Sequence, residues 1–272
     1  MARVIDPVLN FLEIQSSRRG WSLVVLGVSL VIAFCCSIPY YPAVNEFIQS
    51  PYGQAKTWWL EHPLQSVPVE QFLPLNERHI GYNEGIASHL DKMTFRVFLP
   101  LLNQVFPFGI WTLVVACHIG GVLILWLTYF VAKQATGDAV CGGLASWALA
   151  ATYAGQWGFH DYYLGDAVPV ALLMCAMAAR VPVLAFVFVL TAGFTDERAV
   201  VASPLVGLFW VLRSTQQDGV SPGTWVQFFF KFLRAAWPVW LALAAYAAFR
   251  VFCLLFTQIS RLCLCILSLS RL

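Results

Sequence analysis

Apolar stretches about as long as a lipid bilayer is thick constrain this chain more than any other feature. A helix needs about 20 apolar residues to cross the hydrocarbon core, and segments 21–38, 108–132 and 235–256 are mostly apolar over that length. Such stretches fold as helices, because lipid leaves backbone polar groups without partners. Only 11% of the 272 residues are charged, against about 25% in a soluble domain. The sequence predicts an all-α, polytopic transmembrane protein whose residues 1–272 form a single membrane domain.

Further apolar segments bring the predicted number of hydrophobic segments to about seven, of which two or three are short. They are 139–153, 167–179, 181–194 and 199–212. Segments 167–179 and 181–194 are either two short helices or one long kinked helix. Pro182 disfavours a continuous helix, and Arg180 at the centre of a span is costly. We therefore expect two short helices here.

Basic residues set the predicted orientation. Cytoplasmic loops carry an excess of Lys and Arg, which favours a cytoplasmic amino-terminal segment 1–20 containing Arg18 and Arg19. Residues 39–107 then form a large extracytoplasmic loop, with interfacial helices expected near 54–61 and 88–105. Residues 225–234 fit either an interfacial helix on the cytoplasmic side or a lead into the next span. The tail 257–272 is apolar, and we expect the chain to be a shortened member of a larger design.

Polar side chains with chemical potential collect on the predicted outer side. Ionisable residues at membrane depth are costly and are therefore functional candidates. The candidate catalytic carboxylates are Glu46, Asp161 and Asp196. The candidate substrate-binding residues are His89, Arg96, His160, Asp166, Glu197, Arg198 and Arg250. Sugar transfer from a lipid phosphate needs a carboxylate base and cations, for which Arg is well suited.

Each of these groups also has a structural interpretation. Asp196 can cap a helix whose first turn holds Glu197 and an internal ion pair. His160 and Asp161 can be an ordinary hydrated loop pair, and Arg96 can belong to the solvated face of an interfacial helix. His118, within an apolar segment, is expected to hydrogen-bond to a neighbouring helix.

The pattern resembles the GT-C type integral-membrane glycosyltransferases and related bacterial polytopic membrane proteins. The resemblance is carried by SHLDKMTFRVFLPLLNQVFP at 88–107, GFHDYYLGDAVPVALLM at 158–174 and LTAGFTDERAVVASPLV at 190–206. It implies transfer of a sugar from a polyprenyl-phosphate carrier outside the cytoplasm, in a bacterial inner or plasma membrane. It also implies a catalytic acid soon after the first span, where Glu46 lies, and a second-loop acid at Asp161 or Asp166.

Three functions remain open at this level. The first is a lipid-linked sugar transferase, and the second is a non-catalytic membrane subunit or scaffold that binds a lipid or a partner. The third, a transporter, is less favoured because no internal repeat is evident. The expected partners are membrane lipid and a polyprenyl-phosphate sugar. A divalent metal bridging carboxylates and phosphate is optional, and no residue is assigned as a metal ligand. The net charge of +2 offers no basic field for nucleic acid, and the sequence does not define an oligomeric state.

Overall fold

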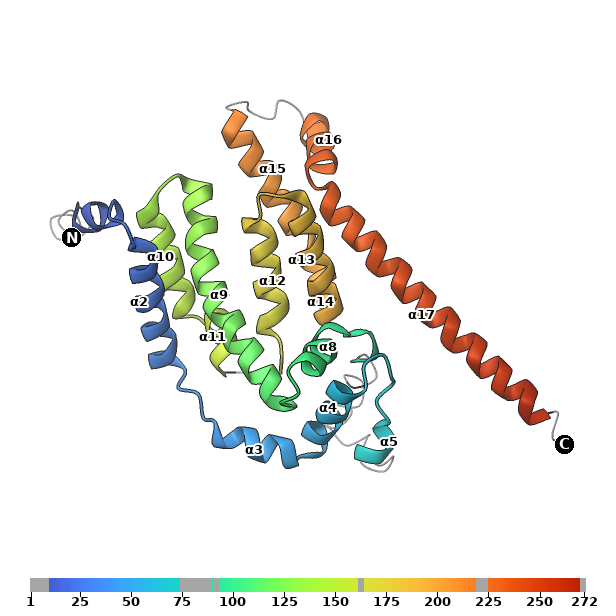
Figure 1. The fold of residues 1–272 in the computed structure, drawn as a ribbon. Coiled ribbons are helices and arrows are strands. Elements are labelled where there is room, and N and C mark those ends of the chain that lie inside the picture. The colour runs from blue at the N-terminus through green and yellow to red at the C-terminus, as the bar shows by residue number, and fades with distance from the viewer. Residues whose placement is uncertain (1–9, 74–89, 91–92, 161–163, 219–224, 270–272) are drawn as a thin grey trace.

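The computed structural model describes residues 10–73, 90, 93–160, 164–218 and 225–269, with the backbone alone at 94, 216–218 and 254–269. Every regular element within these residues is a helix, which confirms the predicted all-α class. Figure 1 shows helices standing side by side, with their turns gathered at two ends. We call the end where the segment 39–107 packs onto the bundle the loop end, and the other the opposite end.

The first half of the bundle consists of α2 (Trp21–Cys36), α9 (Ile110–Thr136), α10 (Ala139–Ala150) and α11 (Tyr153–His160). Gly137 ends α9 in the left-handed region, with φ of 76°, which glycine adopts without steric cost. Asp138 then caps α10 by accepting a hydrogen bond from the Val140 amide at 2.8 Å. The Ser29 and Ser146 hydroxyls join α2 to α10 at 2.8 Å, a polar contact typical of helices packed in lipid.

The second half confirms the two short helices expected around Arg180. They are α12 (Ala167–Ala178) and α13 (Pro182–Thr195). Pro182 takes the first position of α13, where its missing N–H costs no hydrogen bond. A helix of 12 residues, such as α12, is about 18 Å long, which is shorter than the hydrocarbon core.

The chain then continues as α14 (Glu197–Ala202), α15 (Pro204–Asp218), α16 (Trp225–Ala235) and α17 (Trp237–Leu269). The predicted segment 199–212 is thus divided before Pro204, and α15 extends past the predicted end at 212 to Asp218. Among the described residues, α9 alone is long and apolar enough to cross a membrane by itself. The number of possible membrane spans rises to three if two bent helix pairs each form one span. These pairs are Asn10–Ser16 with α2, bent by 120°, and α16 with α17, bent by 62°.

Seven spans are therefore not established, and α10, α12 and α13 are the shorter apolar helices. The helices are compatible with an integral membrane protein whose chain crosses the membrane more than once. Large apolar side chains such as Leu23, Val31 and Ile119 face outward with more than half of their surface exposed. In a membrane protein these surfaces would contact lipid, as the apolar composition requires.

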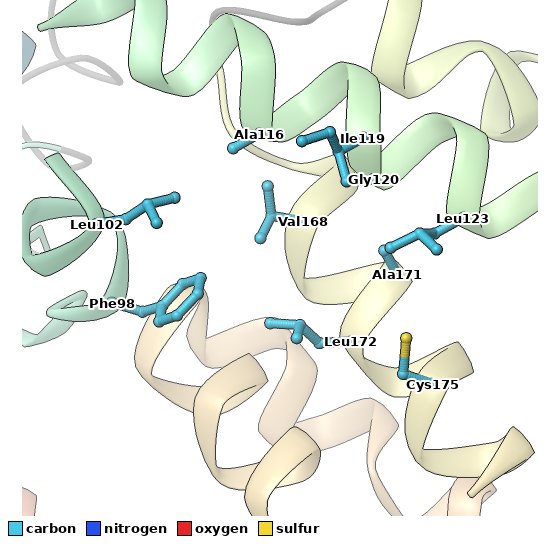
Figure 2. A pocket seen from close by; sticks show the side chains of 10 residues that line it. All are labelled: Phe98, Leu102, Ala116, Ile119, Gly120, Leu123, Val168, Ala171, Leu172 and Cys175. Atoms are coloured by element: carbon cyan, nitrogen blue, oxygen red, sulfur yellow. The ribbon is translucent and has the colours of Figure 1, made fainter. Parts of the chain in front are cut away.

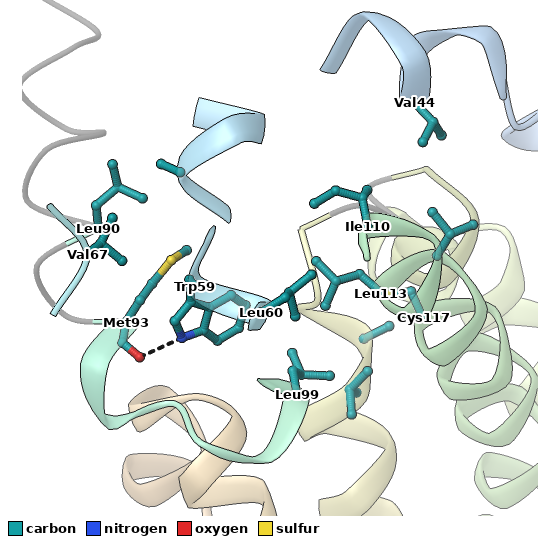
Figure 3. Close-up of a cluster of buried hydrophobic side chains, with 14 of the residues drawn as sticks. Val44, Trp59, Leu60, Val67, Leu90, Met93, Leu99, Ile110, Leu113 and Cys117 are labelled. Carbon is teal, nitrogen blue, oxygen red and sulfur yellow. Dashed lines mark hydrogen bonds between the residues drawn. The ribbon is translucent and has the colours of Figure 1, made fainter. Parts of the chain in front are cut away.

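The segment 39–107 contributes α3 (Pro42–Gln49), α4 (Pro51–Glu61), α5 (Val69–Phe72), the short 3-10 helix η1 (Met93–Phe95) and α8 (Phe98–Val105). The predicted helix at 54–61 is confirmed within α4, whereas the predicted continuous helix at 88–105 is wrong. The Met93 carbonyl accepts hydrogen bonds from the Arg96 amide and from the Trp59 indole at 2.9 Å. Figure 3 shows Trp59 and Met93 in the apolar cluster that fixes α4 against α9.

Candidate functional site

Four charged side chains from three separate segments meet at the loop end. Arg96 lies between η1 and α8, Asp166 directly precedes α12, and Asp196 and Arg198 stand at the start of α14. Figure 1 places α8 and α14 close together at this end. We call these four residues the arginine–aspartate cluster.

Asp196 is the centre of the cluster. Its side chain is 3% exposed and lies 3.2 Å from Nη1 of Arg96, whose own side chain is 9% exposed. Arg198 donates to the same carboxylate from its backbone amide at 2.8 Å and from Nη2 at 2.7 Å. Burial raises the pKa of Asp196, but the hydrogen bonds from Arg198 and the charge of Arg96 outweigh it and hold the pKa below its usual range.

Asp196 therefore combines the expected capping role with a buried ion pair. A carboxylate that binds protons this weakly is a poor general base. The contacts give Asp196 a positioning role for two guanidinium groups, and its predicted catalytic role remains a prediction.

Arg198 extends the cluster toward solvent. Its Nη2 also lies 2.6 Å from the Asp166 carboxylate, and its side chain is 64% exposed. Arg96 has its Nε atom buried with no hydrogen-bond partner among the described residues. The cluster thus presents one accessible guanidinium group, held in place by two carboxylates.

A second ion pair adjoins the cluster. Arg250 of α17 lies 3.6 Å from the carboxylate of Glu197, and both side chains are about one third exposed. The Arg250 guanidinium also lies over the Phe95 ring, 4.3 Å from its centroid, a cation–π contact. Glu197 and Arg250 thereby connect α17 to the segment that carries Arg96.

Lys56 is a charged group that the sequence analysis did not select. It lies on α4, is 1% exposed, and donates from Nζ to the Leu164 carbonyl at 2.8 Å. Burial lowers its pKa to about 8, against the opposing attraction of Asp166. The sequence signal for this buried lysine was its position between Ala55 and Thr57 in a helix bounded by aromatic residues. The burial of its side chain, however, depends on packing by segments that are distant in sequence.

An apolar cavity of about 180 Å³ is lined by residues of the helices that follow Arg96 and Asp166 and by residues of α9. Figure 2 shows it between α8, α9 and α12, with Phe98 and Leu102 on one side and Val168 and Ala171 on the other. Val168 is two residues from Asp166, and Phe98 is two residues from Arg96. A cavity of about 150 Å³ holds a benzene ring, so this one has room for about six carbon atoms.

The remaining predicted residues lie apart or outside the described part. Glu46 is exposed on α3, and within the described residues no ion pair or side-chain hydrogen bond joins it to the cluster. His160 is exposed at the end of α11, with its ring 5.8 Å from that of Tyr153. His89 and Asp161 lie outside the described residues. Within the described residues, no three His, Cys, Asp or Glu side chains gather as a metal site would require.

His118 hydrogen-bonds to a carbonyl of its own helix and to the residue that precedes α3. Its Nδ1 lies 2.7 Å from the Val114 carbonyl, so it donates there, and its Nε2 accepts from the Tyr41 hydroxyl at 3.0 Å. Tyr41 caps α3 rather than belonging to a neighbouring apolar helix. His118 therefore ties α3 to α9.

Comparisons of this chain with protein-family models, with curated proteins and with solved structures return no match.

Proposed function

We propose that this protein binds a polyprenyl-phosphate-linked sugar at the loop end and acts as a GT-C-like glycosyltransferase there. One observation carries the proposal: the exposed guanidinium group of Arg198 pairs with Asp166, which precedes by two residues Val168 in the lining of the apolar cavity. A lipid phosphate has the matching chemistry, with an anionic head on an apolar chain. The cavity volume of about 180 Å³ corresponds to roughly one five-carbon isoprene unit.

The cluster supports a role in holding the phosphate. Arg198 is the accessible arginine of the cluster, with its side chain 64% exposed. Its Nε and Nη2 donate to Asp196 and Asp166, so Nη1 is the atom proposed to donate to the phosphate. Asp196 and Asp166 fix its guanidinium group before any ligand arrives. Such preorganisation lowers the entropy lost on binding.

The proposed orientation places the loop end outside the cytoplasm. The opposite end carries Lys133 in the last turn of α9, Arg180 in the turn before α13, and Arg213 of α15, which agrees with the positive-inside rule. The amino terminus is then cytoplasmic, in a bacterial inner or plasma membrane. Transfer of the sugar would take place on the extracytoplasmic face, with Asp161 or Glu46 as the proposed base.

The same geometry also favours a second candidate, a non-catalytic lipid-binding subunit. The specific observation is that Asp196, the most deeply buried of the candidate carboxylates that the structure describes, pairs with two arginines. Binding of a lipid phosphate is common to both functions, and sugar transfer separates them.

Binding is tested first, with the full chain in lipid nanodiscs and undecaprenyl phosphate as the probe. Arg198→Gln removes a charged hydrogen-bond donor, which is worth about 1.5–3 kcal/mol, so affinity should fall by about tenfold or more. Cys175→Phe fills the cavity and should weaken binding similarly. Cys35→Phe is the matched control, because Cys35 is exposed on α2. Equal binding of undecaprenol without phosphate, or unchanged binding by Cys175→Phe, would contradict the proposed site.

Transfer is tested in membranes that contain the protein, supplied with labelled polyprenyl-phosphate sugars. Loss of transfer in Glu46→Gln or Asp161→Asn, with expression and lipid binding intact, would identify the base. Asp196→Asn should instead lower the free energy of unfolding, because Arg96 loses its buried partner. Binding without transfer across a broad donor panel would favour the non-catalytic subunit.

A further inference from the structure

Helix α16 exposes a broad apolar face at the opposite end of the bundle. At about 100° per residue, this face covers an arc of about 140° and is formed by Trp225, Val226, Phe229, Phe230 and Leu233. Trp225 is 87% exposed and Phe230 is 65% exposed. Side chains of this size cost free energy when they remain in water.

The orientation of α16 is fixed by a different face. The Phe232 ring lies 5.2 Å from that of Trp240 of α17, edge to face, and Phe228 is half-buried. The helix bends away from α17 by 62°. It therefore does not continue the direction of α17, and the apolar face points away from the bundle.

The third face of α16 is polar and basic. Gln227, Lys231 and Arg234 fall within an arc of about 60°, and the helix contains no acidic residue. Arg180, in the exposed turn before α13, adds positive charge at the same end. Apolar residues and basic residues on separate faces are typical of helices that lie in a membrane interface.

A second bend supports a membrane surface at this level. The helix Asn10–Ser16 turns from α2 by 120° and exposes Phe11 and Ile14 by 58% and 62%. Figure 1 shows both bends at the end away from α4 and α8. Both short helices leave the bundle direction at the same end, and each exposes apolar side chains. One membrane surface would cover both helices, whereas protein contacts would require a partner for each.

We propose that α16 lies in the plane of the membrane interface, with its apolar face in the acyl region and Lys231 and Arg234 bound to anionic phospholipid headgroups. Basic side chains near a bilayer surface attract anionic lipids, and the aromatic residues suit the boundary between headgroups and acyl chains. This interaction is independent of sugar transfer and requires only that the bundle is embedded in a membrane.

The experiment uses the full chain in vesicles with a photocrosslinking residue at one position of α16. Phe230→p-benzoylphenylalanine tests the apolar face, and Gln227→p-benzoylphenylalanine on the polar face is the matched control. Mass spectrometry identifies the adducts. We expect adducts to lipid acyl chains at 230 and far fewer at 227. Protein adducts at 230 would show that a partner or second copy covers the face, and equal adducts at both positions would show that α16 is not interfacial; either result overturns the proposal.

The headgroup preference is measured with vesicles of phosphatidylcholine that contain a minority of phosphatidylglycerol. The readout is the ratio of phosphatidylglycerol to phosphatidylcholine adducts at position 230. Lys231→Gln with Arg234→Gln should lower this ratio by about fivefold for each charge removed. Arg18→Gln with Arg19→Gln removes the same charge before α2 and should leave the ratio unchanged. An unchanged ratio in the α16 variant would overturn the anionic-lipid assignment.

Discussion

Asp196→Asn separates the charge of Asp196 from its capping role. Asn caps a helix about as well as Asp, so the start of α14 should persist in this variant. Arg96 would lose its carboxylate partner while its side chain remains 9% exposed. Removing one partner of a buried pair costs about 3–5 kcal/mol. The contact with Arg198, whose side chain is 64% exposed, should add no more than about 1 kcal/mol.

The free energy of unfolding should therefore fall by about 3–5 kcal/mol. It can be measured by titrating sodium dodecyl sulfate into mixed micelles and following helix content by circular dichroism. A double-mutant cycle sharpens the test, because Arg96→Met with Asp196→Asn removes both charges and should cost much less than the sum of the single changes. Arg198→Gln with Asp196→Asn should show the smaller coupling.

Two results would refute this reasoning. One is a loss below about 1 kcal/mol for Asp196→Asn, the value of an exposed pair. The other is a stronger coupling of Asp196 to Arg198 than to Arg96. Either result would show that burial does not set the strength of the cluster.

Three further predictions concern pH and packing. The pKa of Asp196 is lowered in the folded protein, so the ionised carboxylate stabilises the fold at pH values above the unfolded-state pKa of about 3.9. The melting temperature should therefore drop as the pH falls through the lower folded-state pKa. Asp196→Asn should abolish that drop. For Lys56 the folded pKa of about 8 lies below the ordinary value of 10.5, so the free energy of unfolding should rise by up to about 3 kcal/mol between those pH values; Lys56→Met in the same titration should show no rise. Gly158→Ala should lower the melting temperature, since a Cβ there would lie 2.5 Å from Cα of Gly121, whereas Gly27→Ala meets nothing within 4 Å and should be neutral or stabilising.

Local sequence signals predicted the parts of the fold that depend on a few adjacent residues. Pro182, two residues after Arg180, marked the break between α12 and α13, because proline disfavours a continuous helix. The convergence of Arg96, Asp196 and Arg198 was also predictable in outline, since the alternation of apolar segments places their loops at one end.

The rest depended on contacts between distant residues. The continuous helix expected at 88–105 fails where the Met93 carbonyl bonds to Trp59, 34 residues away. Lys56 is buried because α4 docks on the bundle and the Leu164 carbonyl, 108 residues away, receives its ammonium group. No periodicity within a single helix encodes either contact. The apolar cavity is likewise formed by three helices, and its lining residues look like ordinary apolar positions in the sequence.

The Arg96–Asp196 pair has a consequence for the order of synthesis. Arg96 leaves the ribosome about 100 residues before the carboxylate that neutralises it, which corresponds to about 5–20 seconds of translation. During that interval α9 can already be inserted, while the segment holding Arg96 cannot close over a buried charge. Docking of the loop should therefore be among the last steps of assembly, and nascent chains that end before residue 196 should leave the 39–107 segment open to protease.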